Sequence, residues 1–126
     1  MVEALSKRIL VFTVPAPCLF INSNQRLNYH AKAKLTKIWR SATEAETRRV
    51  MNGPLTTPVR ITAKIHKPGN RIWDPNNLAP TTKACVDGMV DAGLITDDSW
   101  REVEGPDHRR GAALQDAITF MIEELT

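Results

Sequence analysis

The sequence has few cysteines and no long hydrophobic run, and these two shortages exclude several kinds of protein. Its 126 residues include two cysteines, Cys18 and Cys85, with no CxxC spacing and no nearby pair of histidines. A zinc site or a disulfide framework is therefore not indicated, and we expect two buried free thiols. No apolar run approaches the roughly 18 residues that a membrane-spanning helix needs, so we expect no membrane partner.

Signals for export and several familiar binding motifs are also missing. The N-terminal stretch MVEALSKRILVF has a short apolar part and no small-residue cleavage site, so we expect a cytoplasmic protein without a secretory signal. The chain has no zinc-finger or RNP-like motif. An EF-hand is excluded, because counting Asp74 as position 1 puts Ala79 where the turn glycine belongs and Cys85 where the bidentate glutamate belongs.

The composition of the chain is typical of one soluble domain. With 42% hydrophobic and 25% charged residues, a chain of this length can bury one hydrophobic core. The periodicity of its apolar residues predicts four elements. They are a strand at 8–14, a helix near 33–51, a strand at 59–66 with one buried face, and a helix from about 78 to 92.

Two later segments are less clear. Residues 100–104 fit a short strand, and Gly105 to Gly111 (GPDHRRG) is typical of a polar, basic turn. The stretch ALQDAITFMIEEL alternates like a strand, but it also has apolar residues at helical spacing. Periodicity alone leaves both interpretations of this last stretch open.

Charges are segregated along the chain, whose net charge is +3. Between Arg26 and Arg40 there are five Lys or Arg residues and no acid, which we call the basic block. Between Asp74 and Glu104 there are seven of the fourteen acids and two basic residues. The basic block alone is either an ordinary solvated surface or a phosphate-binding surface. Both regions together would suit a protein that binds a polyanion and also a divalent cation.

Two short motifs of the acidic region, WDPNN at 73–77 and TDD at 96–98, are either ordinary turns or two halves of one metal site. Asp side chains often cap local N–H groups in turns. Asp97 and Asp98, however, repel each other near the negative end of the preceding helix, and a bound cation would relieve this repulsion. Oxygen ligands without His or Cys favour Mg²⁺ or Mn²⁺ over zinc.

These motifs and the residues between them resemble a known family. They are similar to the central signature of the RusA family of crossover-junction endodeoxyribonucleases, which are frequent in phages. The matching pattern is Asp74-x-x-Asn77-Leu78, followed by Lys83, Asp87, Gly93 and Asp97-Asp98. The similarity includes a strand, a loop with prolines, a helix and a strand before the motif, and so covers most of the chain.

The resemblance implies a fold, an activity and partners. The implied fold is a single α+β domain over residues 1–126, with a small mixed sheet and two main helices, and the implied assembly is a homodimer. The implied activity is Mg²⁺- or Mn²⁺-dependent hydrolysis of phosphodiester bonds, which resolves four-way (Holliday) DNA junctions by paired symmetrical cuts in recombination and repair. A phage-encoded protein would act in the host cytoplasm. The resemblance also favours a strand for the C-terminal stretch.

Site residues are carried over by position in the motif. The resemblance implies catalytic roles for Asp74, Lys83 and Asp98. The implied metal ligands are Asp74, Asp97 and Asp98, with Asn76 and Asp87 as further candidates. For Lys83, the alternative is a surface ion pair with Asp87 at i+4 spacing.

The chain departs from the family pattern at Asn76, where the family has a second carboxylate. The spacer between Leu78 and Lys83 is also longer and contains Pro80. An asparagine offers a carbonyl oxygen but no charge, so it should weaken a metal site. Either Asp87 or Asp91 substitutes for the missing carboxylate, or activity is reduced, or Asn76 is an engineered inactivating change. The alternative function is therefore a protein that binds branched DNA with weak or no cleavage.

Phosphate contacts are expected from the basic block and from the basic residues after Asp107. The expected DNA-binding residues are Arg26, His30, Lys32, Lys34, Lys37, Arg109 and Arg110. Because no base-reading motif is present, junction recognition should rest on shape and charge. Trp39, Trp73 and Trp100 are expected in the core or at a dimer contact.

Overall fold

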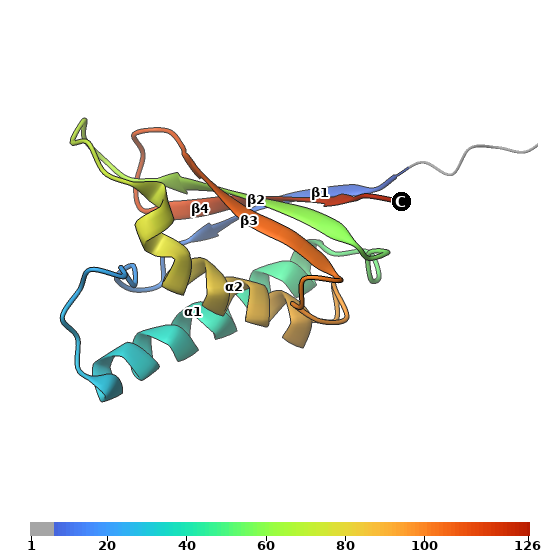
Figure 1. The fold of residues 1–126 in the computed structure, drawn as a ribbon, viewed down its shortest axis with the longest axis horizontal. Coiled ribbons are helices and arrows are strands. Elements are labelled where there is room, and N and C mark those ends of the chain that lie inside the picture. The colour runs from blue at the N-terminus through green and yellow to red at the C-terminus, as the bar shows by residue number, and fades with distance from the viewer. Residues whose placement is uncertain (1–6) are drawn as a thin grey trace, which may run out of the picture.

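The computed structural model describes residues 7–126, which form a four-stranded mixed sheet with two helices packed on one of its faces (Figure 1). Its elements are β1 (Ile9–Pro15), α1 (Tyr29–Val50), β2 (Val59–His66), the 3₁₀ helix η1 (Pro75–Leu78), α2 (Ala79–Asp91), β3 (Val103–Arg110) and β4 (Ala117–Glu124). The expected α+β class, with a small mixed sheet and two main helices, is confirmed. The first six residues of the stretch considered as a secretory signal lie outside the described residues.

The strand order of the sheet is β1-β4-β2-β3. β4 lies antiparallel to both β1 and β2, whereas β3 pairs in parallel with β2 and forms one edge. Because side chains alternate across a strand, every second residue of the two central strands faces the helices. The fully buried core residues of these strands are Val59, Ile61, Ala63, Ile65, Ile118, Phe120 and Ile122.

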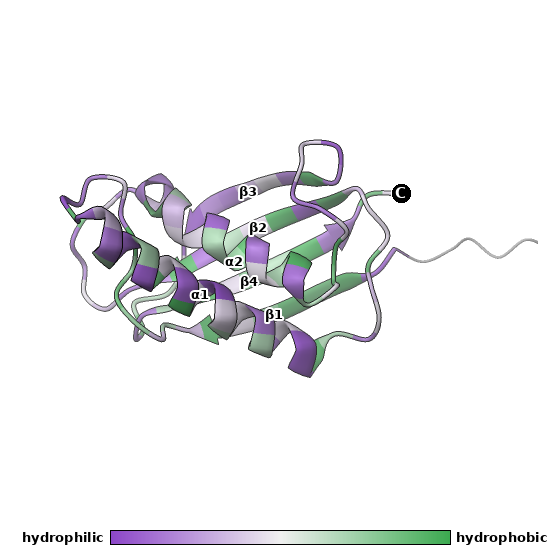
Figure 2. Cartoon of the chain, turned by 90° about the horizontal axis from the view of Figure 1, so that it is seen from below, coloured by the Kyte–Doolittle hydropathy of each residue, from purple (hydrophilic) through white to green (hydrophobic). Residues whose placement is uncertain are grey.

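The two helices lie close together because Gly88 places no side chain between them. A Cβ atom at Gly88 would lie only 2.4 Å from the backbone carbonyl oxygen of Arg40. Trp39 of α1 is fully buried, and its ring stacks on Phe20 with centroids 5.4 Å apart. The indole Nε1 of Trp39 also donates to the carbonyl oxygen of Leu19 at 2.9 Å, which ties the loop after β1 to α1. Figure 2, which views the molecule from the helical side, shows hydrophilic residues on the outer surface of α1.

Most predicted elements are confirmed. β2 has the predicted bounds, α2 lies within the predicted 78–92, and the C-terminal stretch is a strand. α1 begins four residues before the predicted start, because the Oδ1 atom of Asn28 accepts a hydrogen bond from the backbone N of Ala31 and caps the helix there. Trp39 is buried as expected, but Trp100 is 83% exposed and does not belong to the core.

The prediction of a polar turn at Gly105 to Gly111 is wrong, because most of this segment belongs to β3. β3 is an edge strand with a single pairing partner, and only its first residue, Val103, is fully buried. Its polar composition therefore carries little strand signal. Gly105 is required by the close pairing with β2, since a Cβ atom there would lie 2.6 Å from the carbonyl oxygen of Ile61.

Both cysteines are free, as expected. Burial is complete for Cys85, where it raises the pKa of the thiol to about 12, and partial for Cys18. A thiol with such a high pKa is a poor nucleophile. Within residues 7–126, no helix is long and apolar enough to cross a membrane.

Candidate functional site

The N-terminal end of α2 is formed by a local sequence that favours a helix start. Pro75 and Pro80 lie in the first turns of η1 and α2, where a missing N–H removes no intrahelical hydrogen bond. The Oδ1 atom of Asp74 accepts a hydrogen bond from the backbone N of Asn76 at 2.9 Å and so caps η1. This start places Lys83 in the second turn of α2.

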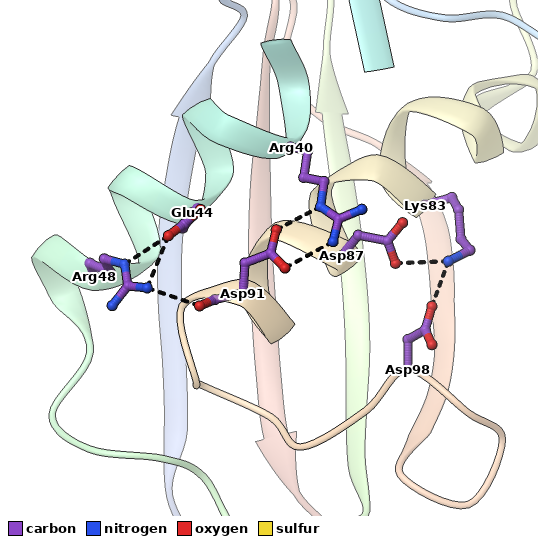
Figure 3. Close-up of polar contacts among 7 residues, drawn as sticks. All are labelled: Arg40, Glu44, Arg48, Lys83, Asp87, Asp91 and Asp98. Carbon is purple, nitrogen blue, oxygen red and sulfur yellow. Dashed lines mark hydrogen bonds and ion pairs between the residues drawn. The ribbon is translucent and has the colours of Figure 1, made fainter. Parts of the chain in front are cut away.

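Lys83 joins α2 to the TDD loop. Its Nζ atom lies 2.8 Å from Oδ1 of Asp87, one turn along the helix, and 2.5 Å from Oδ2 of Asp98 in the loop (Figure 3). The pKa of Lys83 is raised by its bonds to Asp87 and Asp98, and the pKa of Asp98 is lowered, chiefly by Lys83. Lys83 and Asp98 are therefore charged at neutral pH. We call Lys83, Asp87 and Asp98 the lysine cluster.

The loop before β3 holds Asp98 in place through its own backbone. The Oδ1 atom of Asp97 accepts a hydrogen bond from the backbone N of Asp98 at 2.8 Å, as in an ordinary Asx turn. Asp97 is exposed and Asp98 is half-buried. The two adjacent carboxylates therefore differ, because Asp97 caps the turn and Asp98 reaches Lys83.

The lysine cluster borders a groove of about 240 Å³ between α2 and β3. The groove has an apolar part formed by Val86, Val103 and Pro106 and a polar part formed by Thr82, Lys83, Asp98 and His108. A groove with an ammonium group, a carboxylate and an imidazole on its wall has the groups needed to hold a phosphate diester and to move a proton. The i+4 spacing predicted Lys83 and Asp87 as neighbours, and the family resemblance grouped Asp98 with them, but neither predicted the groove.

His108 was considered only as one of the basic residues after Asp107 that would contact phosphates, and the structure places it in the groove. Its Nε2 atom lies 2.8 Å from Oγ1 of Thr82 on α2. Burial lowers the pKa of His108, and the charges of Asp107 and Asp74 oppose this effect in part. The only sequence signal was the histidine itself, because its segment had the composition of a turn.

Asp74 and Asn76 lie at the N-terminal end of the α2 region, apart from the lysine cluster. Asp74 is exposed, and it is near enough to His108 to raise that residue's pKa. Asn76 is also exposed and lies within η1. The structure thus brings Asp98 and Asp87 together through Lys83 and places Asp74 on the side of His108.

The fit of these residues to a divalent cation depends on how many ligands the protein must supply. Within residues 7–126, no three His, Cys, Asp or Glu side chains are grouped so that they could hold a metal ion, so the five expected ligands do not form one such group. Asp87 and Asp98 nevertheless both bind one cation, the Lys83 ammonium. Mg²⁺ is commonly held by one or two carboxylates, with waters and substrate phosphates completing its shell. The Asp87 and Asp98 pair fits that mode.

A separate set of ion pairs connects α1 to the C-terminal half of α2. Arg40 forms a bidentate pair with Asp91, at 2.6 Å and 2.9 Å, and Arg48 donates to the backbone carbonyl of Asp91 at 2.9 Å (Figure 3). Asp91 therefore points towards α1, whereas Asp87 points towards Lys83. Of the two acids considered as substitutes at the metal site, Asp87 is the one that contacts Lys83.

The predicted DNA-binding residues fall into two groups. The exposed members on the loop before α1 and on α1 are Arg26, His30, Lys32, Lys34 and Lys37. On α1, Lys32 and Lys37 border a shallow hollow of about 440 Å³ that also includes Tyr29 and Arg40. This surface carries positive charge beside an exposed aromatic ring, since Tyr29 is 81% exposed.

The second group, Arg109 and Arg110, ends β3. Successive residues of a strand face opposite sides of the sheet, so these two side chains do not share one surface. Arg109 pairs with Lys64 across the strands and lies 3.7 Å from Asp107, whereas Arg110 is beside the buried Ile65. Arg110 is therefore on the side of the helices and of the groove.

Comparisons with known proteins find no matching family model and no curated protein with significant similarity. A functional conclusion therefore rests on the residues and on the geometry described above.

Proposed function

We propose that this protein is a Mg²⁺- or Mn²⁺-dependent endodeoxyribonuclease that acts on branched DNA, with four-way junctions as its substrate. The observation that carries the proposal is the lysine cluster at the edge of the groove, where Lys83, Asp87 and Asp98 meet. These three positions belong to the RusA-like motif, and they come together from α2 and the TDD loop.

Asp98 and Asp87 would hold the divalent cation at the edge of the groove, with Asp97 beside them. When bound, a divalent cation supplies Lewis-acid stabilisation of phosphoryl oxygens and a water of lowered pKa. Asp74 and Asn76 would act from the other end, near His108. The carbonyl oxygen of Asn76 adds a neutral ligand where a carboxylate would add charge.

Lys83 would contact the scissile phosphate. Its side chain is 64% exposed in spite of its two carboxylate partners, so a phosphate oxygen can approach it from the groove. A positive charge at this place stabilises the negative charge that builds on the phosphate in the transition state.

The basic surface of α1 supports binding of a polyanion. Lysines that neutralise phosphates release condensed counterions, so affinity should fall steeply with salt. Neither this surface nor the groove has the pattern of side chains that reads base edges, which is consistent with recognition of DNA shape.

A second candidate function is binding of branched DNA without efficient cleavage. Asn76 favours this function, because it gives the chain one carboxylate fewer than the RusA family pattern has at the Asp74 end of the site. Among residues 7–126, Lys83 pairs with only two carboxylates and no group of three possible ligands is present, which also favours this function.

We also propose that the protein acts as a homodimer in the cytoplasm. The face of the sheet opposite the helices has exposed apolar side chains on β1, with Ile9 58% and Val11 57% exposed. A second copy of the chain could cover this face. Sedimentation equilibrium of the parent protein and of Val11→Lys tests the dimer, which should dissociate in the variant and would be refuted by a monomeric parent.

The function itself is tested with an end-labelled four-way junction incubated with and without Mg²⁺ or Mn²⁺. Cleavage that needs the metal supports the nuclease, and a shifted band without cleavage supports the binding protein. If neither cleavage nor a shifted band is observed, both DNA functions are refuted. Asn76→Asp should increase cleavage if the missing carboxylate limits the rate.

A further inference from the structure

His108 lies on the face of β3 that turns towards the helices. In the parallel register, it pairs with Ala63 of β2, whose side chain is fully buried in the core. Its ring therefore enters the groove from the sheet side, while Lys83 and Asp98 line the groove from α2 and from the loop. Three different segments thus bring an imidazole, an ammonium and a carboxylate to one hollow.

The contacts of Thr82 bear on which nitrogen of His108 carries the proton. The Oγ1 atom of Thr82 lies 3.2 Å from the backbone carbonyl oxygen of Ala79 and 2.8 Å from Nε2 of His108, where either atom can be the donor. We assign the one hydroxyl proton to the Ala79 carbonyl, so that Oγ1 accepts from His108 Nε2–H. In the neutral ring, the lone pair is then on Nδ1. Within residues 7–126, Nδ1 has no hydrogen-bond partner, whereas both ring nitrogens of His66 have one.

Of the titratable side chains that line the groove, His108 is the one whose neutral form is favoured. Burial puts the pKa of His108 below its usual value of 6.5, although Asp107 and Asp74 raise it in part. Across the groove, the pKa of Asp98 is lowered and that of Lys83 is raised. Ala63, the neighbour on β2, does not titrate. At pH 7 the ring is therefore a neutral base.

We propose that His108 is a further catalytic residue of this site, the general base that takes a proton from the attacking water through Nδ1. This inference rests on the proposed nuclease function and adds a residue to it. Thr82 is the positioning residue, because it fixes the tautomer that leaves Nδ1 available.

In the proposed step, the water oxygen forms a bond to phosphorus while one water proton passes to the lone pair of Nδ1. The bond between phosphorus and the leaving 3′ oxygen breaks with its electron pair, and this oxygen takes a proton from solvent water. The products are a 5′ phosphate and a 3′ hydroxyl, and His108 returns its proton to solvent.

The test is the pH profile of single-turnover cleavage of the four-way junction by the parent protein, His108→Gln and His66→Gln. The parent rate should fall as the pH drops through the pKa of His108, below 6.5. His108→Gln should lose roughly 10²- to 10⁴-fold in rate, the usual contribution of a general base, and lose this acidic limb. His66→Gln is the matched control, because His66 lies on the opposite face of the sheet. This variant should keep the parent rate and the acidic limb of the pH profile.

A second variant and a rescue experiment separate catalysis from a structural role. Thr82→Val keeps the shape of the side chain but removes the acceptor for Nε2–H, so its rate should be intermediate. Free imidazole added to His108→Gly should restore part of the rate, which a merely structural histidine would not allow. Circular dichroism and junction affinity without metal establish that each variant is folded and binds DNA.

Different results would refute the role of His108 and the nuclease function. If the parent cuts the junction and His108→Gln retains its rate and acidic limb, the role of His108 is refuted and the nuclease stands. If the parent cuts no DNA with either metal, both proposals are refuted.

Discussion

The Nζ atom of Lys83 lies 2.5 Å from Oδ2 of Asp98, across fifteen residues of sequence, and this contact joins the second helix to the TDD loop. The same ammonium also binds Asp87. A lysine in this position has two consequences. It holds the loop against α2, and it occupies the place between two carboxylates that a divalent cation would take.

Lys83→Met should therefore strengthen divalent cation binding while weakening cleavage. The exposed ion pairs of Lys83 are worth at most about 1 kcal/mol, so removing this competitor should improve Mn²⁺ affinity by up to about fivefold. Titration followed by electron paramagnetic resonance of free Mn²⁺ measures the change without DNA. Asp98→Asn is the opposite control and should weaken binding. Equal Mn²⁺ affinity of the parent and Lys83→Met would mean that the lysine and the ion do not compete.

Replacing Lys32 and Lys37 by glutamine should weaken junction binding and reduce its salt dependence. Each lost phosphate contact lowers the slope of log affinity against log salt concentration by about 1. Fluorescence anisotropy over a range of KCl concentrations, without divalent metal, gives both quantities. Lys64→Gln on β2 is the matched control, because Lys64 faces the side of the sheet without helices. An unchanged slope in the double variant would mean that the α1 surface does not contact DNA phosphates.

Gly88→Ala should destabilise the protein although alanine favours helices. The added Cβ would lie 2.4 Å from the Arg40 carbonyl oxygen, so α1 and α2 must separate, which costs about 1 to 3 kcal/mol and outweighs the gain in helix propensity. Urea denaturation measures the free energy of unfolding. A stabilised variant would show that the two helices are not held at this close distance.

Glu124 should contribute to stability at neutral pH and lose that contribution in acid. Its carboxylate accepts hydrogen bonds from the backbone N atoms of Thr56 and Arg8 and from the Arg8 side chain, which lowers its pKa from 4.5 to about 2. A lowered pKa means that the stabilisation is present above pH 4.5 and is lost as the pH falls towards 2. Glu124→Gln should thus lower the thermal midpoint at pH 7 and flatten its dependence on pH between 4.5 and 2. Glu123 lies on the other face of β4 and serves as the control. Glu123→Gln should change neither the thermal midpoint at pH 7 nor the dependence of that midpoint on pH.

The sequence predicted the fold where local pattern and burial agree. β2 alternates strictly between buried and exposed residues, so its bounds were predicted correctly. The strand expected at 100–104 overlaps only the first two residues of β3, Val103 and Glu104. The rest of β3 was not predicted, because an edge strand buries almost nothing and the composition GPDHRRG is that of a turn. Its conformation comes from parallel pairing with β2, which is tertiary information.

In the site, too, local sequence pattern predicted some contacts, whereas others depend on tertiary packing. The i+4 spacing predicted the Lys83 and Asp87 pair, and the motif placed Asp98 near them. His108 was considered only as a phosphate contact, because its place in the groove depends on β3 facing α2. Asp91 was considered as a metal ligand, yet it pairs with Arg40, since the packing of α1 on α2 brings that arginine to it.

The most direct test of the nuclease proposal is the single-turnover cleavage rate of a four-way junction and of a linear duplex by the parent protein and by Asp98→Asn in Mg²⁺. We expect metal-dependent paired cuts in the junction by the parent, little cutting of the duplex, and a large loss of rate in Asp98→Asn with junction binding retained. Cleavage by Asp98→Asn at the parent rate would contradict the proposed site.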